Sequence, residues 1–160
     1  MPELHLRPMT AEEYREYHRE AVASYADDMV RNVRLSPEAA ETRAAATMRD
    51  LLPEGLGTLD HWIEVAEDEH GERVGQLWFA RRATPAGDIV FLFDIEVVEA
   101  ERGRGYGRRL MELLEEEVAA LGLARIELNV FGHNEVARGL YEDMGYVEMS
   151  RQLFKELGAG

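Results

Sequence analysis

The feature that most constrains the fold is an abrupt change of pattern near residue 98. Residues 89–98 form an almost wholly apolar run, which is typical of a central strand covered on both faces. Three glycines follow within residues 103–107, and apolar residues then recur at helical spacing, at Leu110, Leu113, Leu114, Val118 and Leu121. The chain therefore needs a fold in which a buried strand, a glycine-rich turn and an amphipathic helix follow one another directly.

A junction of this kind is suited to binding an anion. Glycine lets the backbone approach a phosphate closely, while the free N–H groups and the dipole of the first helical turn favour negative charge. Arg102, Arg104 and Arg108 add full positive charges. The same residues are also compatible with an ordinary turn that carries solvated arginines, so the segment needs a second signal.

Two nucleotide-binding motifs are excluded by the residues themselves. A P-loop requires Gly-Lys followed by Ser or Thr, which is absent. The dinucleotide fingerprint requires Gly or Ala where Arg108 stands, and its fold begins with this unit, whereas roughly 100 residues precede it here. Neither triphosphate hydrolysis nor nicotinamide chemistry is expected.

The rest of the chain reads as one continuous succession of elements. Thr10 and Glu13 form a capping box for a helix that reaches about residue 30, and Ser36 followed by Pro37 begins a second helix. Strand patterns cover residues 4–7, 62–66, 74–80, 89–98, 126–130 and 149–154, with a short helix at 135–143. This order predicts a single α/β (α+β) domain over residues 1–160 with a mixed, mostly antiparallel sheet flanked by helices.

Composition narrows the functional classes. The chain has 18 basic and 32 acidic residues, a net charge of −14, which argues against nucleic-acid binding. It has no cysteine, and its five histidines show no paired ligand spacing, so neither a thiol nucleophile nor a metal site is expected. No apolar run approaches the roughly 20 residues that span a bilayer, and no signal peptide is recognisable. We expect a cytoplasmic protein without membrane contact.

A second informative segment spans residues 134–146. Asn134 stands where a helix N-cap is expected, and Gly145 is suited to ending that helix. Tyr141 falls on the apolar stripe with Leu140 and Met144, a position more typical of a core residue than of a catalytic one. Each of these residues has an adequate structural explanation when it is considered alone.

Taken together, the two segments resemble the GCN5-related N-acetyltransferase (GNAT) family. The resemblance lies in Arg102-x-x-Gly105-x-Gly107, followed by Asn134 and then by Leu140-Tyr141 ahead of Gly145-Tyr146. It is specific over residues 94–146 and looser upstream. It implies a GNAT-like acyl-CoA acyltransferase fold in which the central strands, residues 89–98 and 126–130, splay apart to admit acetyl-CoA.

The resemblance also implies residue roles. The pantetheine arm would lie along the central strand, the pyrophosphate would sit in the glycine loop, and Tyr141 would lie near the thioester sulfur. The cofactor-binding residues implied in this way are Ile95, Val97, Arg102, Gly103, Arg104, Gly105, Tyr106, Gly107, Arg108, Asn134 and Tyr141.

With no cysteine available for an acyl-enzyme, direct attack of a neutral amine on the thioester is the economical route. A phenol, whose ordinary pKa is about 10, can protonate the departing thiolate, so Tyr141 is the catalytic acid that we expect. Glu96 is the preferred base and Asp94 the next candidate, with Glu127 and Asn129 in reserve. Asp94 and Glu96 could equally be solvated residues at a strand end.

The alternative function is a non-catalytic acetyl-CoA-binding sensor or interaction module with the same fold. Both functions keep the glycine loop, and they differ in the acceptor site and in the role of Tyr141. The identity of the acceptor amine stays open, as does the oligomeric state, a homodimer included.

Overall fold

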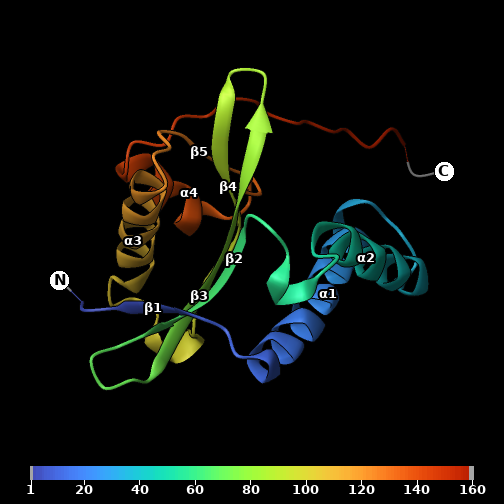
Figure 1. The fold of residues 1–160 in the computed structure, drawn as a ribbon. Helices are drawn as coiled ribbons and strands as arrows, with labels where there is room; N and C mark the ends of the chain where they lie inside the picture. The colour runs from blue at the N-terminus through green and yellow to red at the C-terminus, as the bar shows by residue number, and fades with distance from the viewer. Residues whose placement is uncertain (1, 159–160) are drawn as a thin grey trace. The chain divides into compact units, whose positions relative to one another are not determined.

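The computed structural model describes residues 2–158 and divides the chain into two compact units, one ending at Leu128 and the other beginning at Asn129. The first unit holds the sheet and three long helices, and the second holds one shorter helix (Figure 1). The four α-helices are α1 (Ala11–Asn32), α2 (Pro37–Leu51), α3 (Tyr106–Ala120) and α4 (Glu135–Asp143). None of the helices within residues 2–158 is long and apolar enough to cross a membrane.

The sheet of the first unit has five strands in the order β1-β2-β3-β4-β5. Neighbours from β1 to β4 are antiparallel, and β5 runs parallel to β4. The strands are β1 (His5–Pro8), β2 (His61–Glu67), β3 (Arg73–Thr84), β4 (Gly87–Val97) and β5 (Ile126–Leu128). This arrangement confirms the mixed, mostly antiparallel sheet predicted from the sequence.

The helix starts follow local sequence signals. Thr10 accepts the N–H of Glu13 while the Glu13 carboxylate accepts the N–H of Thr10, which is the predicted capping box of α1. At α2 only half of this arrangement is present: Ser36 Oγ accepts the N–H of Ala39 over 3.2 Å, and Pro37 stands at the first helical position. These caps fix where both helices begin.

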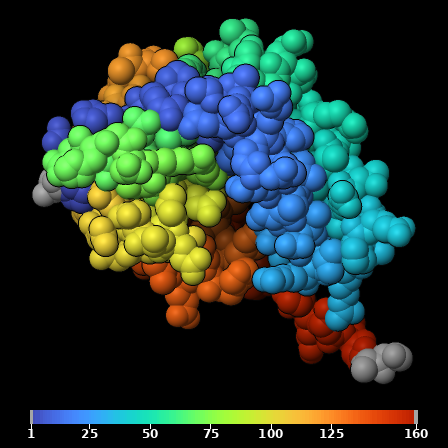
Figure 2. Space-filling view, turned by 90° about the horizontal axis from the view of Figure 1, so that it is seen from below, coloured from blue at the N-terminus to red at the C-terminus, as the bar shows by residue number. Residues whose placement is uncertain are grey.

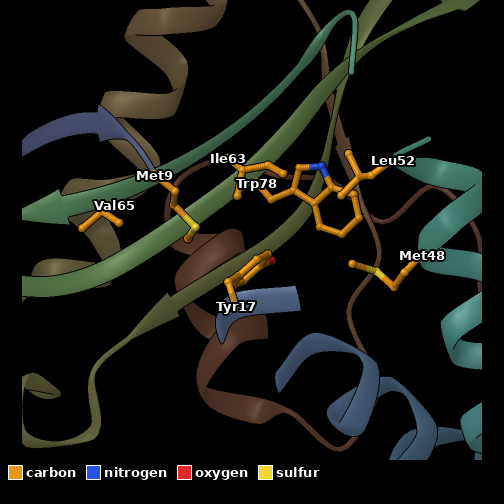
Figure 3. Packing of buried hydrophobic residues seen from close by; sticks show 7 residues of the cluster. All are labelled: Met9, Tyr17, Met48, Leu52, Ile63, Val65 and Trp78. Atoms are coloured by element: carbon orange, nitrogen blue, oxygen red, sulfur yellow. The ribbon is translucent and has the colours of Figure 1, made fainter. Parts of the chain in front are cut away.

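Two apolar clusters join the helices to opposite faces of the sheet. The larger one packs α1 and α2 on the sheet and contains Met9, Tyr17, Met48, Leu52, Ile63, Val65 and Trp78 (Figure 3). The smaller one packs α3 on the other face through Leu4, Ala66, Val74 and Leu110. Both faces of β3 are therefore buried, which accounts for its almost continuous apolar sequence.

The strand β4 departs from regular pairing on both of its edges. Trp78 pairs with Asp94 and Phe79 with Leu92, so Phe93 is an extra residue that forms a β-bulge. On the other edge, β5 pairs with β4 only from Val90 to Leu92. Residues 93–97 of β4 thus continue along an edge where β5 has ended, as expected for strands that splay apart.

One predicted strand is wrong. Residues 149–154 form no strand, and the exposed fractions of Met149, Leu153 and Phe154 are 71%, 81% and 88%. A strand needs a neighbouring strand for its backbone hydrogen bonds, and the described part of the second unit contains none. The apolar residues Met149, Leu153 and Phe154 were therefore insufficient to define a strand here.

Candidate active site

Two acidic side chains near the end of β4, Asp94 and Glu96, are linked through one amide. Gln76 lies opposite Glu96 in the β3–β4 register. Its Nε2 donates to Glu96 Oε2 over 3.2 Å and to Asp94 Oδ2 over 3.4 Å. The Gln76 Oε1 accepts from the Arg73 guanidinium, which fixes the direction of the amide. The two carboxylates therefore share a sheet face, and their hydrogen bonds to the buried Gln76 amide fix their positions.

Asp94 is the more enclosed of the two acids. The Tyr17 hydroxyl donates to its Oδ2 over 2.7 Å, and Tyr17 itself is only 3% exposed. Burial raises the pKa of Asp94, while the hydrogen bonds from Tyr17 and Gln76 work in the opposite direction. Burial and the Asp94 charge raise the pKa of Tyr17 well above 10, so this hydroxyl stays a donor. Asp94 is thus fully engaged in linking α1 to the sheet.

Glu96 is the accessible acid. Its side chain is 56% exposed, and Arg102 Nη2 lies 3.8 Å from its Oε1. Partial burial raises the pKa of Glu96, the Asp94 charge raises it further, and the Arg102 charge opposes both. An accessible carboxylate with a raised pKa can take a proton from a bound group. In the space-filling view the surface is hollowed between α1, in blue, and the yellow segment that follows β4 (Figure 2).

The backbone of Val97 offers polar groups beside this acid. The neighbouring Val98 N–H donates to the Val74 carbonyl over 2.9 Å, so it points toward β3. Successive N–H groups of a strand point to opposite edges, and the Val97 N–H is therefore directed at the edge where β5 has ended. The Val97 carbonyl accepts from Arg102 Nε over 3.0 Å. One backbone donor of β4 thus lies beyond the last residue that pairs with β5.

The glycine loop needs glycine for its backbone conformation. Gly103 and Gly105 have φ values of 80° and 83°, which residues with a Cβ rarely adopt. A Cβ at Gly103 would meet nothing within 4 Å, and one at Gly105 only Pro2 Cγ at 3.7 Å. The loop surface over both glycines is therefore open rather than packed.

The start of α3 differs from those of the other three α-helices in residues 2–158. Thr10 caps α1, Ser36 caps α2 and Asn134 caps α4, but α3 begins at Gly105 with no side-chain cap and no acid in its first turn. The first intrahelical donor is the N–H of Arg109, which reaches the Gly105 carbonyl over 3.1 Å. The N–H groups of residues 106–108 thus lack helical acceptors, as an anion site at a helix start requires.

The three arginines predicted to bind phosphate lie around this helix start, and each is near a carboxylate. Arg102 lies near Glu96, Arg104 Nη1 is 3.1 Å from Glu101, and Arg108 Nε is 3.6 Å from Glu112. All three side chains are more than half exposed. These ion pairs were not foreseen from the sequence. They are solvated contacts worth little energy, so a ligand can replace them.

The two predicted site residues of the second unit lie on α4. Asn134 is the N-cap that the sequence predicts, because its Oδ1 accepts the N–H of Ala137 over 3.3 Å. Tyr141 is buried, with its ring centroid 5.7 Å from that of Tyr146. The positions of these two side chains are described within the second unit alone, and their roles toward a cofactor stay predictions.

Sequence reasoning missed the part that Gln76 and Tyr17 play at the carboxylates. A lone glutamine inside the otherwise apolar residues 74–80 was an available signal, because a buried amide requires hydrogen-bond partners. The Tyr17 ring packs in the apolar cluster between α1, α2 and the sheet, as its place in an amphipathic helix suggests. Its hydroxyl contact with Asp94 had no sequence signal. Within residues 2–158 no group of three or more metal-ligating side chains occurs.

Comparison with known proteins gives consistent matches over nearly the whole chain. The sequence model of the "Acetyltransferase (GNAT) family" matches residues 26–146. Two N-acetyltransferases of Bacillus subtilis strain 168 each align over 152 residues, which is 95% of this chain and 97% of theirs: YycN with 32% identity and YdgE with 28%.

Solved structures agree with these sequence matches. The crystal structure of YycN from Bacillus subtilis has a TM-score of 0.90 and 31% identity, over 98% of this chain and all of that one. AAC(6')-Iy in complex with the bisubstrate analogue CoA-S-monomethyl-acetylneamine has a TM-score of 0.61 and 15% identity, over 98% of this chain and 99% of its own. At this low identity, the likeness to AAC(6')-Iy shows a shared fold alone.

Proposed function

Because this chain belongs to the acetyltransferase (GNAT) family, we propose that it transfers the acetyl group of acetyl-CoA to a primary amine of a small molecule or peptide, by direct attack in a ternary complex. The observation that carries this proposal is the accessible Glu96 on the part of β4 that β5 does not pair, one short loop before the uncapped start of α3. Residues 1–160 act as one acetyltransferase domain in this proposal.

The residues present suit acetyl-CoA. The open surface over Gly103 and Gly105 and the first-turn N–H groups of α3 fit a pyrophosphate, with Arg102, Arg104 and Arg108 around them. Residues 95–97 of β4 would hold the pantetheine arm by their backbone. The fold neighbour AAC(6')-Iy is described with a CoA-linked analogue, which supports this assignment. Acetyl-CoA would supply an acetyl group activated as a thioester.

Glu96 is the proposed base. An amine arrives as an ammonium ion, whose ordinary pKa is about 10, and it must lose a proton before it can attack a carbonyl carbon. The raised pKa of Glu96 reduces the difference between its pKa and that of the ammonium, which favours proton transfer. The exposure of the carboxylate gives the amine access to it. Asp94 is a positioning residue, because its carboxylate is enclosed by Tyr17 and Gln76.

Two further groups complete the proposed chemistry. The Val97 N–H would donate to the carbonyl oxygen as negative charge develops on it. Tyr141 Oη would protonate the departing thiolate sulfur, which requires the second unit to bring Tyr141 to the open edge of β4. In the same proposal Asn134 bonds the cofactor arm through the part of its amide that does not cap α4.

The test combines binding with turnover on one preparation. Acetyl-CoA at a hundredfold excess over its dissociation constant should stabilise the fold by about 2.7 kcal/mol, which a melting curve detects. CoA thiol release is then measured against a panel of primary amines. Stabilisation without thiol release from any amine would favour a non-catalytic acetyl-CoA-binding module. Absence of both effects would contradict the proposal as a whole.

A further inference from the structure

An aromatic strip continues from the carboxylates along the same face of the sheet. It consists of His61, Trp78, Phe91 and Phe93. Phe93 stacks on Trp78 with a centroid distance of 4.5 Å and on His61 at 5.7 Å, and Phe91 meets Phe93 edge-on at 4.9 Å. Phe91 and Phe93 are only partly buried, so the strip presents aromatic surface near Asp94 and Glu96.

His61 is built into this strip as a neutral ring. Its Nδ1 accepts from Trp78 Nε1 over 3.0 Å, which leaves the proton on Nε2. Burial is the largest influence on the pKa of His61 and lowers it, the Arg82 charge lowers it further, and only Asp60 opposes them. The strip therefore adds no positive charge of its own at neutral pH.

A single guanidinium marks the far end of the strip. Arg82 is exposed, and its Cζ lies 4.2 Å from the ring centroid of Phe91 and 5.7 Å from that of Phe93. It has no carboxylate within ion-pair distance among residues 2–158. The adjacent Arg81 points to the other face and is paired with Asp88 at 2.8 Å. The stacked Arg82 thus keeps its N–H donors available for an anion.

The spacing along the sheet relates the two ends. In β3, Gln76 lies opposite Glu96 and Ala80 lies opposite Phe91. Four residues of strand span about 13 Å, and the Asp94 level is about 7 Å from the Phe91 level. The Arg82 guanidinium lies over the Phe91 ring, so it stands about 13 Å along the sheet from the Glu96 level. An ammonium and an anion that each lie about 3 Å inside their partner would accordingly stand roughly 7–10 Å apart, with aromatic rings between them.

We propose that the acceptor is a primary amine with a flat apolar body that carries a carboxylate or phosphate at its far end. Glu96 receives the amine, the rings of Phe91 and Phe93 receive the body, and Arg82 receives the anion. This inference rests on the proposed acetyl transfer, and it names the substrate class of the same site. It also gives a reason for an unpaired guanidinium on a chain of net charge −14, whose field otherwise disfavours anionic ligands.

The test uses two matched amines. One is 3-[4-(aminomethyl)phenyl]propanoate, with its amine and carboxylate at opposite ends of a ring, and the other is its neutral primary amide. The wild-type chain should acetylate the acid with a kcat/KM about tenfold higher, mainly through KM, as one charge-assisted hydrogen bond allows. Arg82→Gln should bring the ratio close to one, and salt should reduce the wild-type preference because Arg82 is exposed.

Arg81→Gln is the control, because it removes an adjacent arginine that is already paired and faces the other way. It should leave the preference unchanged. Equal kcat/KM values for acid and amide in the wild type would overturn the inference while leaving acetyl transfer intact. If neither amine turns over, calorimetry with CoA present decides: Arg82-dependent binding of the acid supports the inference and counts against the transfer reaction, whereas no preference in binding refutes it.

Discussion

The Tyr17 hydroxyl and Asp94 Oδ2 are 2.7 Å apart and connect the first half of α1 to the end of β4. This contact joins residues that are 77 positions apart in the sequence. It couples the helix that borders the surface hollow to the strand that carries both acids. Its loss should therefore lower the free energy of unfolding, whatever its effect on catalysis.

Tyr17→Phe should destabilise the fold by about 1–3 kcal/mol, because it leaves the enclosed Asp94 carboxylate without its best donor. The ring packing with Met48 and Trp78 is preserved. Chemical denaturation measures the change. Tyr14→Phe is the control, since the Tyr14 hydroxyl makes no hydrogen bond within residues 2–158. Equal losses in the two variants would show that the Asp94 contact contributes nothing.

Glu96→Gln should lower kcat by 10²–10⁴-fold, the usual range for removal of a general base. In the wild type, kcat/KM should fall with decreasing pH at a value above 4.5, because the pKa of Glu96 is raised and only the deprotonated form accepts a proton. Asp94→Asn removes a charge that raises this pKa, so it should move the acidic limb to lower pH. An acidic limb that Asp94→Asn leaves in place would assign the titration to another group.

Tyr141→Phe should lower kcat substantially while acetyl-CoA affinity changes little, because only the phenolic oxygen is removed and the ring still packs near Tyr146. A fall of 10²–10⁴-fold would support proton donation to the thiolate. A loss below roughly threefold would mean that water protonates the sulfur or that product release limits turnover. An early melting transition together with poor CoA binding would mark Tyr141 as a core residue only.

Gly105→Ala should weaken acetyl-CoA binding more than its effect on folding explains. Forcing a Cβ into a left-handed conformation costs about 1–2 kcal/mol wherever it occurs. Gly122→Ala is the matched control, since Gly122 has a φ of 76°, open surroundings and a place at the opposite end of α3. Both variants should lose similar stability in melting experiments, and calorimetry should show reduced affinity for Gly105→Ala alone. Equal affinities would contradict the phosphate-loop assignment.

Glu64→Gln should remove a pH dependence of stability. Burial is the main cause that raises the pKa of Glu64 to about 8, and a hydrogen bond and the charge of Glu117 add to it. A raised folded-state pKa means that the stability is fully present below 4.5 and is lost as pH rises toward about 8. The variant should melt higher than wild type at pH 8, with a smaller difference at pH 5. The exposed Glu69→Gln should reproduce the wild-type profile.

The parts of the fold that sequence predicted well are set by neighbours in the chain. The capping box of Thr10 and Glu13, the cap at Ser36 and the helix at residues 135–143 depend on a few consecutive residues, and each is confirmed. Helix lengths and strand pairing depend on distant partners. Residues 149–154 carry three apolar side chains that suggested a strand, yet the described second unit contains no strand.

The candidate site divides in the same way. The glycine loop was visible in the sequence because its backbone conformation requires glycine at specific positions, and the two β4 acids were visible because they interrupt an apolar run. The contacts that enclose Asp94 and leave Glu96 accessible could not be predicted from the sequence. They depend on Tyr17, Gln76 and Arg102, which reach the acids from α1, β3 and the loop. Alternation alone treated the two acids as equivalent.

The bulge at Phe93 changes the phase of β4. Before it, odd-numbered positions such as Phe91 face α1, whereas after it the even-numbered Asp94 and Glu96 do. In a strand without the bulge, Phe91 would face one side of the sheet, and Asp94 and Glu96 would face the other. The one additional residue places all three side chains on the same side. A related sequence aligned to this chain by strict alternation would be correct on one side of Phe93 and inverted on the other.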